Sequence, residues 1–298
     1  MFQLAYERAS QFTQPVVSLY RARSGECGWG IGTFVILNDE GWIATAHHVV
    51  NDLLQVTAQV VQNQTIEAGV AALEADGPLH YKDRQKQVRE LRRNAPPIDR
   101  AQIAFGVFGS VSLNGIQVLP EVDLAIGQLE PFDKSLVTGY PVLKNPSLGL
   151  RHGASLCKLG YPFHEIAPTW DEDQQTFDVP PGTFPIAIFP LEGIYTRDVV
   201  LEPRAGVPAP PFPLMWLETS SPGLKGQSGG PIFDTQGSVW GIQCGTLPLA
   251  MDIQGKVRGS GPTLIATEQF LNVGLGVHPA TLTGFLDMHG VRYNASDY

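Results

Sequence analysis

At residues 226–231 the sequence reads Gly-Gln-Ser-Gly-Gly-Pro, between two segments of strand-like composition. A serine that attacks a carbonyl carbon needs backbone N–H groups that converge on the developing oxyanion, and glycine lets the chain bend until they do. The amides of Gly226 and Ser228 are the natural pair for such an oxyanion hole. The stretch therefore predicts an acyl-transfer site with Ser228 as nucleophile. The alternative is a glycine-rich turn in which the hydroxyl only caps a backbone amide.

A serine hydroxyl is a weak nucleophile, so this prediction requires a base and an orienting carboxylate elsewhere in the chain. His47 and His48 follow an apolar run, residues 41–46, that reads as a strand. Alternation along a strand puts the two imidazoles on opposite faces, so only one of them can face Ser228. Asp123 stands alone among apolar residues, where a carboxylate is costly without a donor. The histidines could instead form a metal or surface pair, and Asp123 could bind backbone alone.

The order His, Asp, Ser, with Thr-Ala-x-His ending at His48, resembles the trypsin-like serine peptidase superfamily. The similarity is greatest to its bacterial high-temperature-requirement (Deg-type) and intracellular branches. Further similar segments, spread over residues 15–278, are 32–36, 153–162, 217–219 and 238–243. The resemblance implies a triad of His48 as base, Asp123 as orienting acid and Ser228 as nucleophile. It also implies an all-β fold of two six-stranded antiparallel β-barrels.

We expect one peptidase domain over residues 1–298, with the first barrel at about 1–135 and the second at about 136–278. Residues 54–60 alternate between apolar and polar and are predicted as a strand. Helical spacing up to Pro96-Pro97 predicts a helical insertion in the first barrel at about 66–97. A proline at its start and a glycine at its end predict a C-terminal helix at about 279–290. No room is then left for the PDZ module of Deg-type relatives.

Substrate specificity is read from the two segments that, by the resemblance, border the scissile residue. Trypsin-like cleavers carry an acid six positions before the nucleophile, where this chain has Pro222. We therefore expect a small or medium uncharged side chain at the cleavage site. The predicted substrate-binding residues are Pro222, Lys225, Ile242, Gln243, Cys244 and Gly245. Gln227 replaces an aspartate that pairs with a newly cleaved amino terminus in digestive members, so activation by cleavage is not expected.

Composition restricts the partners and the compartment. The net charge of −9 argues against nucleic acid, and no apolar run is long enough to span a bilayer. Lys82–Arg93 contains six of the 20 Lys and Arg residues, either as a solvated helix face or as a docking surface for an acidic partner. A regulatory protein partner is also possible. Three widely spaced cysteines, and no leader-like segment after Met1, favour a reducing cytoplasm. No metal or other cofactor is predicted.

The leading functional prediction is an intracellular serine endopeptidase that cleaves a specific protein partner through an acyl-enzyme. A first alternative is a catalytically silent protein-binding or chaperone-like module on the same fold. A second alternative is an esterase that uses the same triad on small acyl groups. The strand-turn-helix elbow of α/β-hydrolases does not fit the glycine-rich string around Ser228.

Overall fold

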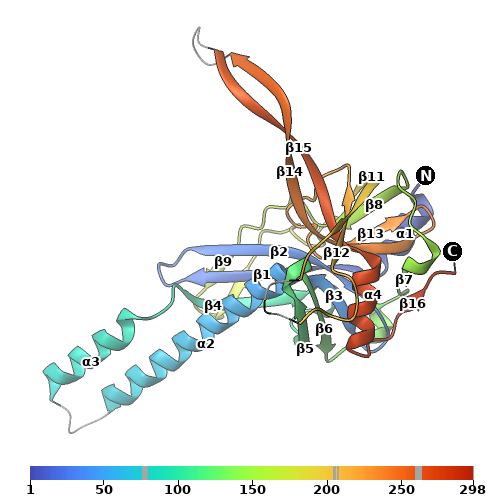
Figure 1. The fold of residues 1–298 in the computed structure, drawn as a ribbon. Helices are drawn as coiled ribbons and strands as arrows, with labels where there is room; N and C mark the ends of the chain where they lie inside the picture. Colours follow the sequence, from blue (N-terminus) through green and yellow to red (C-terminus); the bar gives the residue numbers. More distant parts are fainter. Residues whose placement is uncertain (76–79, 204–205, 207, 259–263, 298) are drawn as a thin grey trace.

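The computed structural model describes residues 1–75, 80–203, 206, 208–258 and 264–297. Two β-sheets pack against each other, and two hairpins, one helical and one of strands, project away from them (Figure 1). The described part of the chain contains no helix that is both long and apolar enough to cross a membrane.

The first sheet is built from six antiparallel strands in the order β4-β1-β2-β3-β6-β5. Its central strands, β2, β3 and β6, are short apolar runs whose inward side chains, such as Phe34 and Ile43, are fully buried. The strands are β1 (Thr13–Ala22), β2 (Cys27–Ile36), β3 (Trp42–Ala46), β4 (Ile98–Phe105), β5 (Ser112–Leu119) and β6 (Leu124–Glu130). This sheet is a half-barrel, and it forms the first of the two barrels of the fold.

The second sheet contains six antiparallel strands in the order β13-β8-β11-β12-β15-β14, and a β13–β14 pairing closes them into a barrel. These strands are β8 (Ser155–Gly160), β11 (Phe189–Val200), β12 (Met215–Thr219), β13 (Pro231–Asp234), β14 (Ser238–Arg258) and β15 (Leu264–Val277). Two short parallel strands extend it, β7 (Val142–Leu143) and β16 (Asn294–Ala295), and a separate hairpin consists of β9 (Thr169–Asp171) and β10 (Thr176–Asp178). The predicted all-β, trypsin-like fold is confirmed.

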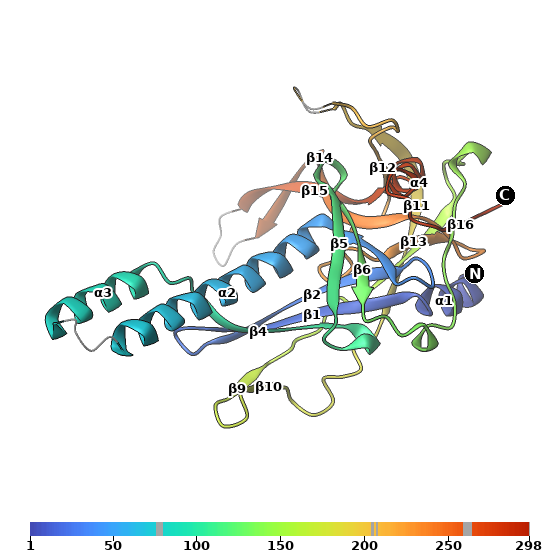
Figure 2. The ribbon, with the colours of Figure 1, turned by 90° about the horizontal axis from the view of Figure 1, so that it is seen from below.

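The α-helices lie outside the sheets. They are α1 (Gln3–Ser10), α2 (His47–Ala75), α3 (Tyr81–Arg93) and α4 (Pro279–Met288). Short 3-10 turns occur at η1 (Gly106–Phe108), η2 (Pro120–Val122), η3 (Lys134–Leu136) and η4 (Pro146–Leu148). In both ribbon views α2 and α3 form a hairpin that reaches far beyond the first sheet (Figure 2). A helical insertion and a C-terminal helix are thus present, but the insertion begins at His47, well before the predicted start at about residue 66.

The strand predicted at residues 54–60 is wrong, because these residues belong to α2. The buried side chains Val49, Val50 and Asn63, together with the partly buried Leu53, are spaced as on one side of a helix. Asn63 also donates its side-chain amide to the carbonyls of Pro96 and Ile98, at 3.0 and 2.6 Å, and so joins α2 to the start of β4. An alternating run of seven residues does not reveal such a helix, because the helical spacing of buried residues appears only when the flanking residues of α2 are included.

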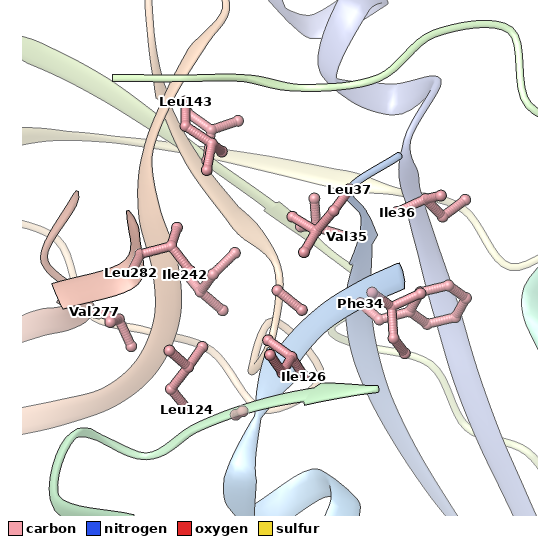
Figure 3. Packing of buried hydrophobic residues seen from close by; sticks show 14 of the residues in the cluster. Phe34, Val35, Ile36, Leu37, Leu124, Ile126, Leu143, Ile242, Val277 and Leu282 are labelled. Atoms are coloured by element: carbon pink, nitrogen blue, oxygen red, sulfur yellow. The ribbon is translucent and has the colours of Figure 1, made fainter. Parts of the chain in front are cut away.

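One hydrophobic core joins the two sheets. Phe34, Leu124 and Ile126 of the first sheet pack with Ile242 and Val277 of the second in a single cluster of buried side chains (Figure 3). Leu282 of α4 belongs to the same cluster. The end of β3 and the start of β6, which pair at Ala46 and Leu124, lie at this junction, so His47 and Asp123 follow and precede neighbouring strand ends.

Candidate active site

Asp123 holds the start of helix α2. It follows the turn η2 in the left-handed conformation, with φ of 59° and ψ of 43°, which aspartate tolerates better than most residues. Its carbonyl oxygen accepts from the His47 N–H at 3.0 Å. Its carboxylate accepts from the backbone N–H of His48 at 2.8 Å and lies 2.6 Å from Nδ1 of the same residue. One acid therefore orients both the backbone and the ring of His48.

This contact also sets the electrostatics of the imidazole. The hydrogen bond with Asp123 raises the pKa of His48 above its ordinary value, and the negative charges of Asp123 and Asp52 act in the same direction, while partial burial opposes them. The His48 side chain is 46% exposed, so it remains open to a ligand. Because Nδ1 faces Asp123, the proton-accepting position that faces outward is Nε2.

The sequence predicts that His47 and His48 continue a strand. In the structure they are instead the first two residues of α2. Adjacent residues of a helix point about 100° apart rather than to opposite faces. The structure joins His48, and not His47, to the Asp123 side chain. The reasoning from strand alternation is therefore wrong, although the residue selected through Thr-Ala-x-His is the one that meets the carboxylate.

The loop around Ser228 depends on two glycines with left-handed backbone. Gly226 has φ of 93° and Gly229 has φ of 88°. A Cβ atom at Gly226 would overlap the carbonyl oxygen of Tyr161, and one at Gly229 would overlap that of Thr33. Only glycine satisfies both the torsion and the space at these two positions. The half-buried Ser228 is held between them.

The amides of this loop divide into two groups. Gln227 donates its N–H to the Leu224 carbonyl at 2.8 Å, and Gly229 and Gly230 donate theirs to the carbonyls of Gln243 and Gln227. Within the described part of the chain, the N–H groups of Gly226 and Ser228 donate to no protein acceptor. The two amides predicted as an oxyanion hole are thus the two that the loop leaves available.

Thr33 of β2 connects the loop to the first sheet. Its N–H donates to the Ser228 carbonyl at 2.9 Å, and its hydroxyl donates to the Gly226 carbonyl at 2.6 Å. Its own carbonyl accepts from the hydroxyl of Thr45 at 2.7 Å. Thr45 lies on β3, two residues before His47, so the serine loop is attached beside the strand that leads to His48. On the other side, Trp216 donates its indole N–H to the Val122 carbonyl at 3.1 Å, next to Asp123.

The two predicted substrate-binding segments lie side by side. Gly223 donates its N–H to the Thr246 hydroxyl at 2.9 Å, and that hydroxyl is 2.8 Å from the Gly223 carbonyl. The buried side chain of Gln243 lies against Gly223 and donates to the carbonyls of Gly245 and Leu275, at 2.7 and 3.0 Å. The space between the two segments is therefore partly filled by an amide.

The other predicted substrate-binding residues differ in their surroundings. Ile242 is fully buried and Cys244 is 6% exposed, and both side chains belong to the hydrophobic core, so only their backbone can contact a substrate. Lys225 is exposed, and its ammonium lies 5.9 Å from the ring centre of Trp29 on β2. Pro222 is half-buried. Among the described residues, no group of three His, Cys, Asp or Glu side chains is arranged to hold a metal ion.

Two residues of the site are absent from the sequence-based prediction. From the sequence Thr33 is predicted only as part of a strand, because its hydrogen bonds reach residues almost 200 positions away. Lys158 lies beneath the Ser221–Pro222 segment and is fully buried. A single charge inside the apolar run 154–161 is a signal that could have identified it.

Comparison with known proteins gives one family and a set of distant structures. Residues 32–242 match the model of the trypsin-like peptidase domain. The active form of the Rv3671c protease from M. tuberculosis is 14% identical, with a TM-score of 0.49 over 98% of this chain and 86% of that chain. The HtrA-type protease AlgW with a tripeptide is 16% identical, with a TM-score of 0.46 over 98% of this chain and 65% of that chain. A search of curated proteins finds no match. Because the family model covers well over half of its residues, the chain belongs to the trypsin-like peptidase family.

Proposed function

We propose that this serine-type endopeptidase hydrolyses peptide bonds of a specific protein partner, with Ser228 as nucleophile, His48 as general base and Asp123 as the acid that orients it. The observation that carries the proposal is the pair of available amides, Gly226 and Ser228, on either side of Gln227. A binding module has no use for a serine flanked by unengaged donors, whereas an acyl-transfer site requires them.

The proposed reaction has two halves. Ser228 Oγ attacks the scissile carbonyl carbon and gives its proton to Nε2 of His48, while the Gly226 and Ser228 amides donate to the oxyanion. The C–N bond then breaks, and the imidazolium delivers the proton to the leaving amine. Water then attacks the carbonyl carbon of the ester and gives its proton to His48. The bond to Ser228 Oγ breaks, His48 returns the proton to Oγ, and the acid is released. Asp123 keeps Nδ1 protonated and stabilises the imidazolium in both halves.

The proposed cleavage site carries a small or medium uncharged side chain. This is supported by the Gln243 amide, which lies against Gly223 and reduces the room between the two walls. No acid stands at Pro222 to attract a basic side chain. A large aromatic residue at this position would have to displace Gln243 from two hydrogen bonds.

For the compartment we propose a reducing cytoplasm. Cys27, Cys157 and Cys244 are all free thiols. Burial raises the pKa of Cys157 to about 11, and it also raises that of Cys244, so neither forms a thiolate readily near neutral pH.

The proposed partner is acidic and docks on helix α3. Lys82, Lys86, Arg89 and Arg93 recur at intervals of four, three and four residues, which places all four on one face of the helix. All four are exposed. Arg92, on another face, binds Glu67 of α2 at 3.1 Å and is thus part of the hairpin itself.

A binding or chaperone-like role without catalysis is the second candidate. Leu247, Met251, Phe270 and Leu271 are exposed apolar side chains on the projecting β14–β15 hairpin (Figure 1). Such a surface is typical of a contact with another protein. In this alternative the hairpin binds the partner and Ser228 never forms an ester.

Fluorophosphonate labelling separates the two candidates. We expect the purified chain to become labelled at Ser228, and Ser228→Ala to remain unlabelled and to lose peptidase activity by several orders of magnitude. The matched control is Ser155→Ala, at a half-buried serine of β8 outside the site, which should be labelled like the parent. Proteomic identification of cleaved proteins then names the partner. Normal peptide cleavage by Ser228→Ala would exclude this nucleophile, and a parent that is never labelled would favour the binding module.

A further inference from the structure

Lys158 is a fully buried lysine in the second barrel. It lies in the middle of β8, where it pairs with Leu191 of β11 on one side and with Ile232 of β13 on the other. Its relative exposure is 0%. An ammonium group taken out of water is costly unless other groups satisfy its donors, so the contacts of this side chain must compensate for its burial.

The three N–H groups of the Lys158 ammonium meet three acceptors. Nζ donates to the Ser221 carbonyl at 2.6 Å, to the Pro222 carbonyl at 2.8 Å and to the Thr219 hydroxyl at 3.1 Å. This number matches the donor capacity of a protonated lysine. None of the acceptors is a carboxylate, so the cation is held by dipoles alone.

Among the side chains that the structure describes on the surrounding strands, no charged group pairs with Lys158. Cys157, its neighbour on β8, is the titratable group whose charge acts on it. The remaining ones face other partners or solvent: Glu218 of β12 binds Arg197 of β11, Asp198 of β11 binds Tyr195, Asp234 of β13 binds Trp240, and Glu192 of β11 is exposed.

The two carbonyls held by Lys158 begin the loop that ends at the nucleophile. Gly223, the next residue, is bonded to Thr246 of β14. Leu224 donates its N–H to the side-chain oxygen of Gln227 at 3.1 Å and accepts the Gln227 N–H at 2.8 Å. Gln227 is fully buried and lies between the two amides proposed as the oxyanion hole. Each of the four consecutive residues 221–224 is therefore held by at least one hydrogen bond, and together they fix the segment that leads to Ser228.

We propose that Lys158 is a positioning residue of the peptidase site: its ammonium holds the Ser221 and Pro222 carbonyls inward and so keeps the loop in the conformation in which the Gly226 and Ser228 amides converge. This inference rests on the proposed function. A neutral amine has two N–H groups and a lone pair, so one of the three acceptors would then face a lone pair and lose its hydrogen bond. The protonated state is therefore the one that orders the loop.

The protonation state changes within an accessible pH range. Burial lowers the pKa of Lys158 from 10.5 to about 7. The loop is held firmly below that pH and loosens above it. The titration of His48 has the opposite effect on activity. His48 must lose its proton to act as a base, so its contribution to the labelling rate increases with pH. The labelling rate of the parent should therefore rise and then fall as the pH increases.

The first test removes the ammonium in the full chain. Lys158→Met should lower the rate of fluorophosphonate labelling on the order of 10²-fold, the size expected when reacting groups are displaced by about 1 Å. Its residual rate should show no fall at alkaline pH. The matched control is Lys144→Met, at a lysine that is 7% exposed and lies over Trp240, away from the loop, and it should be labelled within a few-fold of the parent. A folded Lys158→Met chain with the parent's rate, or with an alkaline fall, would overturn the proposal.

The second test does not depend on catalysis or on a stable Lys158 variant. In the Ser228→Ala chain, the amides of Gly223 and Gln227 should lose hydrogen-exchange protection between pH 6 and pH 9, after correction for the intrinsic rate. Amides in the centre of β2 should stay protected. Unchanged protection in the loop would overturn the inference even if labelling had confirmed the nucleophile. Conversely, if Ser228→Ala retained activity, the proposed function would fail, while the exchange data would still report whether Lys158 orders the loop.

Discussion

Asp123 makes three hydrogen bonds to two consecutive residues, His47 and His48, which begin helix α2. These bonds fix Asp123 beside the start of that helix. A carboxylate at the first turn of a helix accepts N–H groups that have no intrahelical partner, and it is favoured there by the helix dipole. In this chain the same carboxylate also faces Nδ1 of His48, so the helix start and the base share one anchor. The orientation of the His48 ring is therefore coupled to the position of the first turn of α2.

The variant Asp123→Asn separates orientation from folding. Asparagine tolerates the left-handed backbone and can still accept the His48 N–H, so we expect a folded chain. The amide cannot keep Nδ1 protonated in the required tautomer, and the labelling rate should fall on the order of 10⁴-fold. The rate constant for fluorophosphonate labelling, with circular dichroism as the folding control, measures the effect. A loss below tenfold would mean that Asp123 only caps α2.

The His48–Asp123 pair also sets how the labelling rate of the parent protein increases at the acidic end of its pH profile. Because the hydrogen bond with Asp123 raises the pKa of His48 above 6.5, labelling should rise with pH through a midpoint above that value. The free energy of unfolding changes in the opposite direction to the labelling rate. The stabilisation from the His48–Asp123 pair is complete below the pKa of histidine in the unfolded chain, and it is lost as the pH rises through the raised pKa of His48 in the folded chain. NMR titration of the His48 ring should give the same midpoint as labelling. A midpoint below 6.5 would contradict the assigned hydrogen bond.

At the scale of elements, the helical hairpin gives the clearest test of partner choice. Reversing Lys86, Arg89 and Arg93 to Glu should slow cleavage of the acidic partner, because all three lie on the exposed face of α3. The defect should shrink at high salt, where the attraction is already screened in the parent. Hydrolysis of a short generic peptide should stay within about twofold, since exposed charges away from the catalytic groups act mainly on association.

Two further results decide how the hairpin is interpreted. The control variant Arg151→Glu reverses an exposed arginine outside α3 and should leave partner cleavage unchanged. Equal loss on the partner and on the peptide would point to a structural role of α3. No loss on either substrate would leave its basic face as solvated surface.

Some parts of the structure could be predicted from the sequence and others could not, and the difference has a physical reason. The string around Ser228 carries its own backbone chemistry, with glycines at the two left-handed positions 226 and 229, so the serine loop could be recognised locally. The helical state of residues 54–60 could not, because they alternate like a strand and pack as part of α2 on the distant segments β4 and α3. Lys158 was missed because its partners lie more than 60 positions away. Prediction failed wherever contacts between distant segments decide the outcome.

On the scale of the whole molecule, the shared core predicts that both barrels unfold together. Leu282 of α4 is fully buried in the cluster that joins them, so Leu282→Ala should lower the free energy of unfolding by about 2–5 kcal/mol. Met288→Ala, at the 58% exposed end of the same helix, should change it by less than about 0.5 kcal/mol. Denaturant unfolding followed by tryptophan fluorescence and by circular dichroism should give one coincident transition. Two separate transitions would show that the barrels are independent.

Thr33 has a consequence for any attempt to divide this molecule. The nucleophile loop comes from the second barrel, yet its carbonyls at Gly226 and Ser228 are aligned by a residue of the first. Each half-chain, made separately, would retain its own catalytic side chains and still be inert. Mixing the two halves would restore ester formation only as the barrels reassociate. The gain of labelling with concentration would then be a binding curve for the two halves, with Thr33→Ala weakening the complementation.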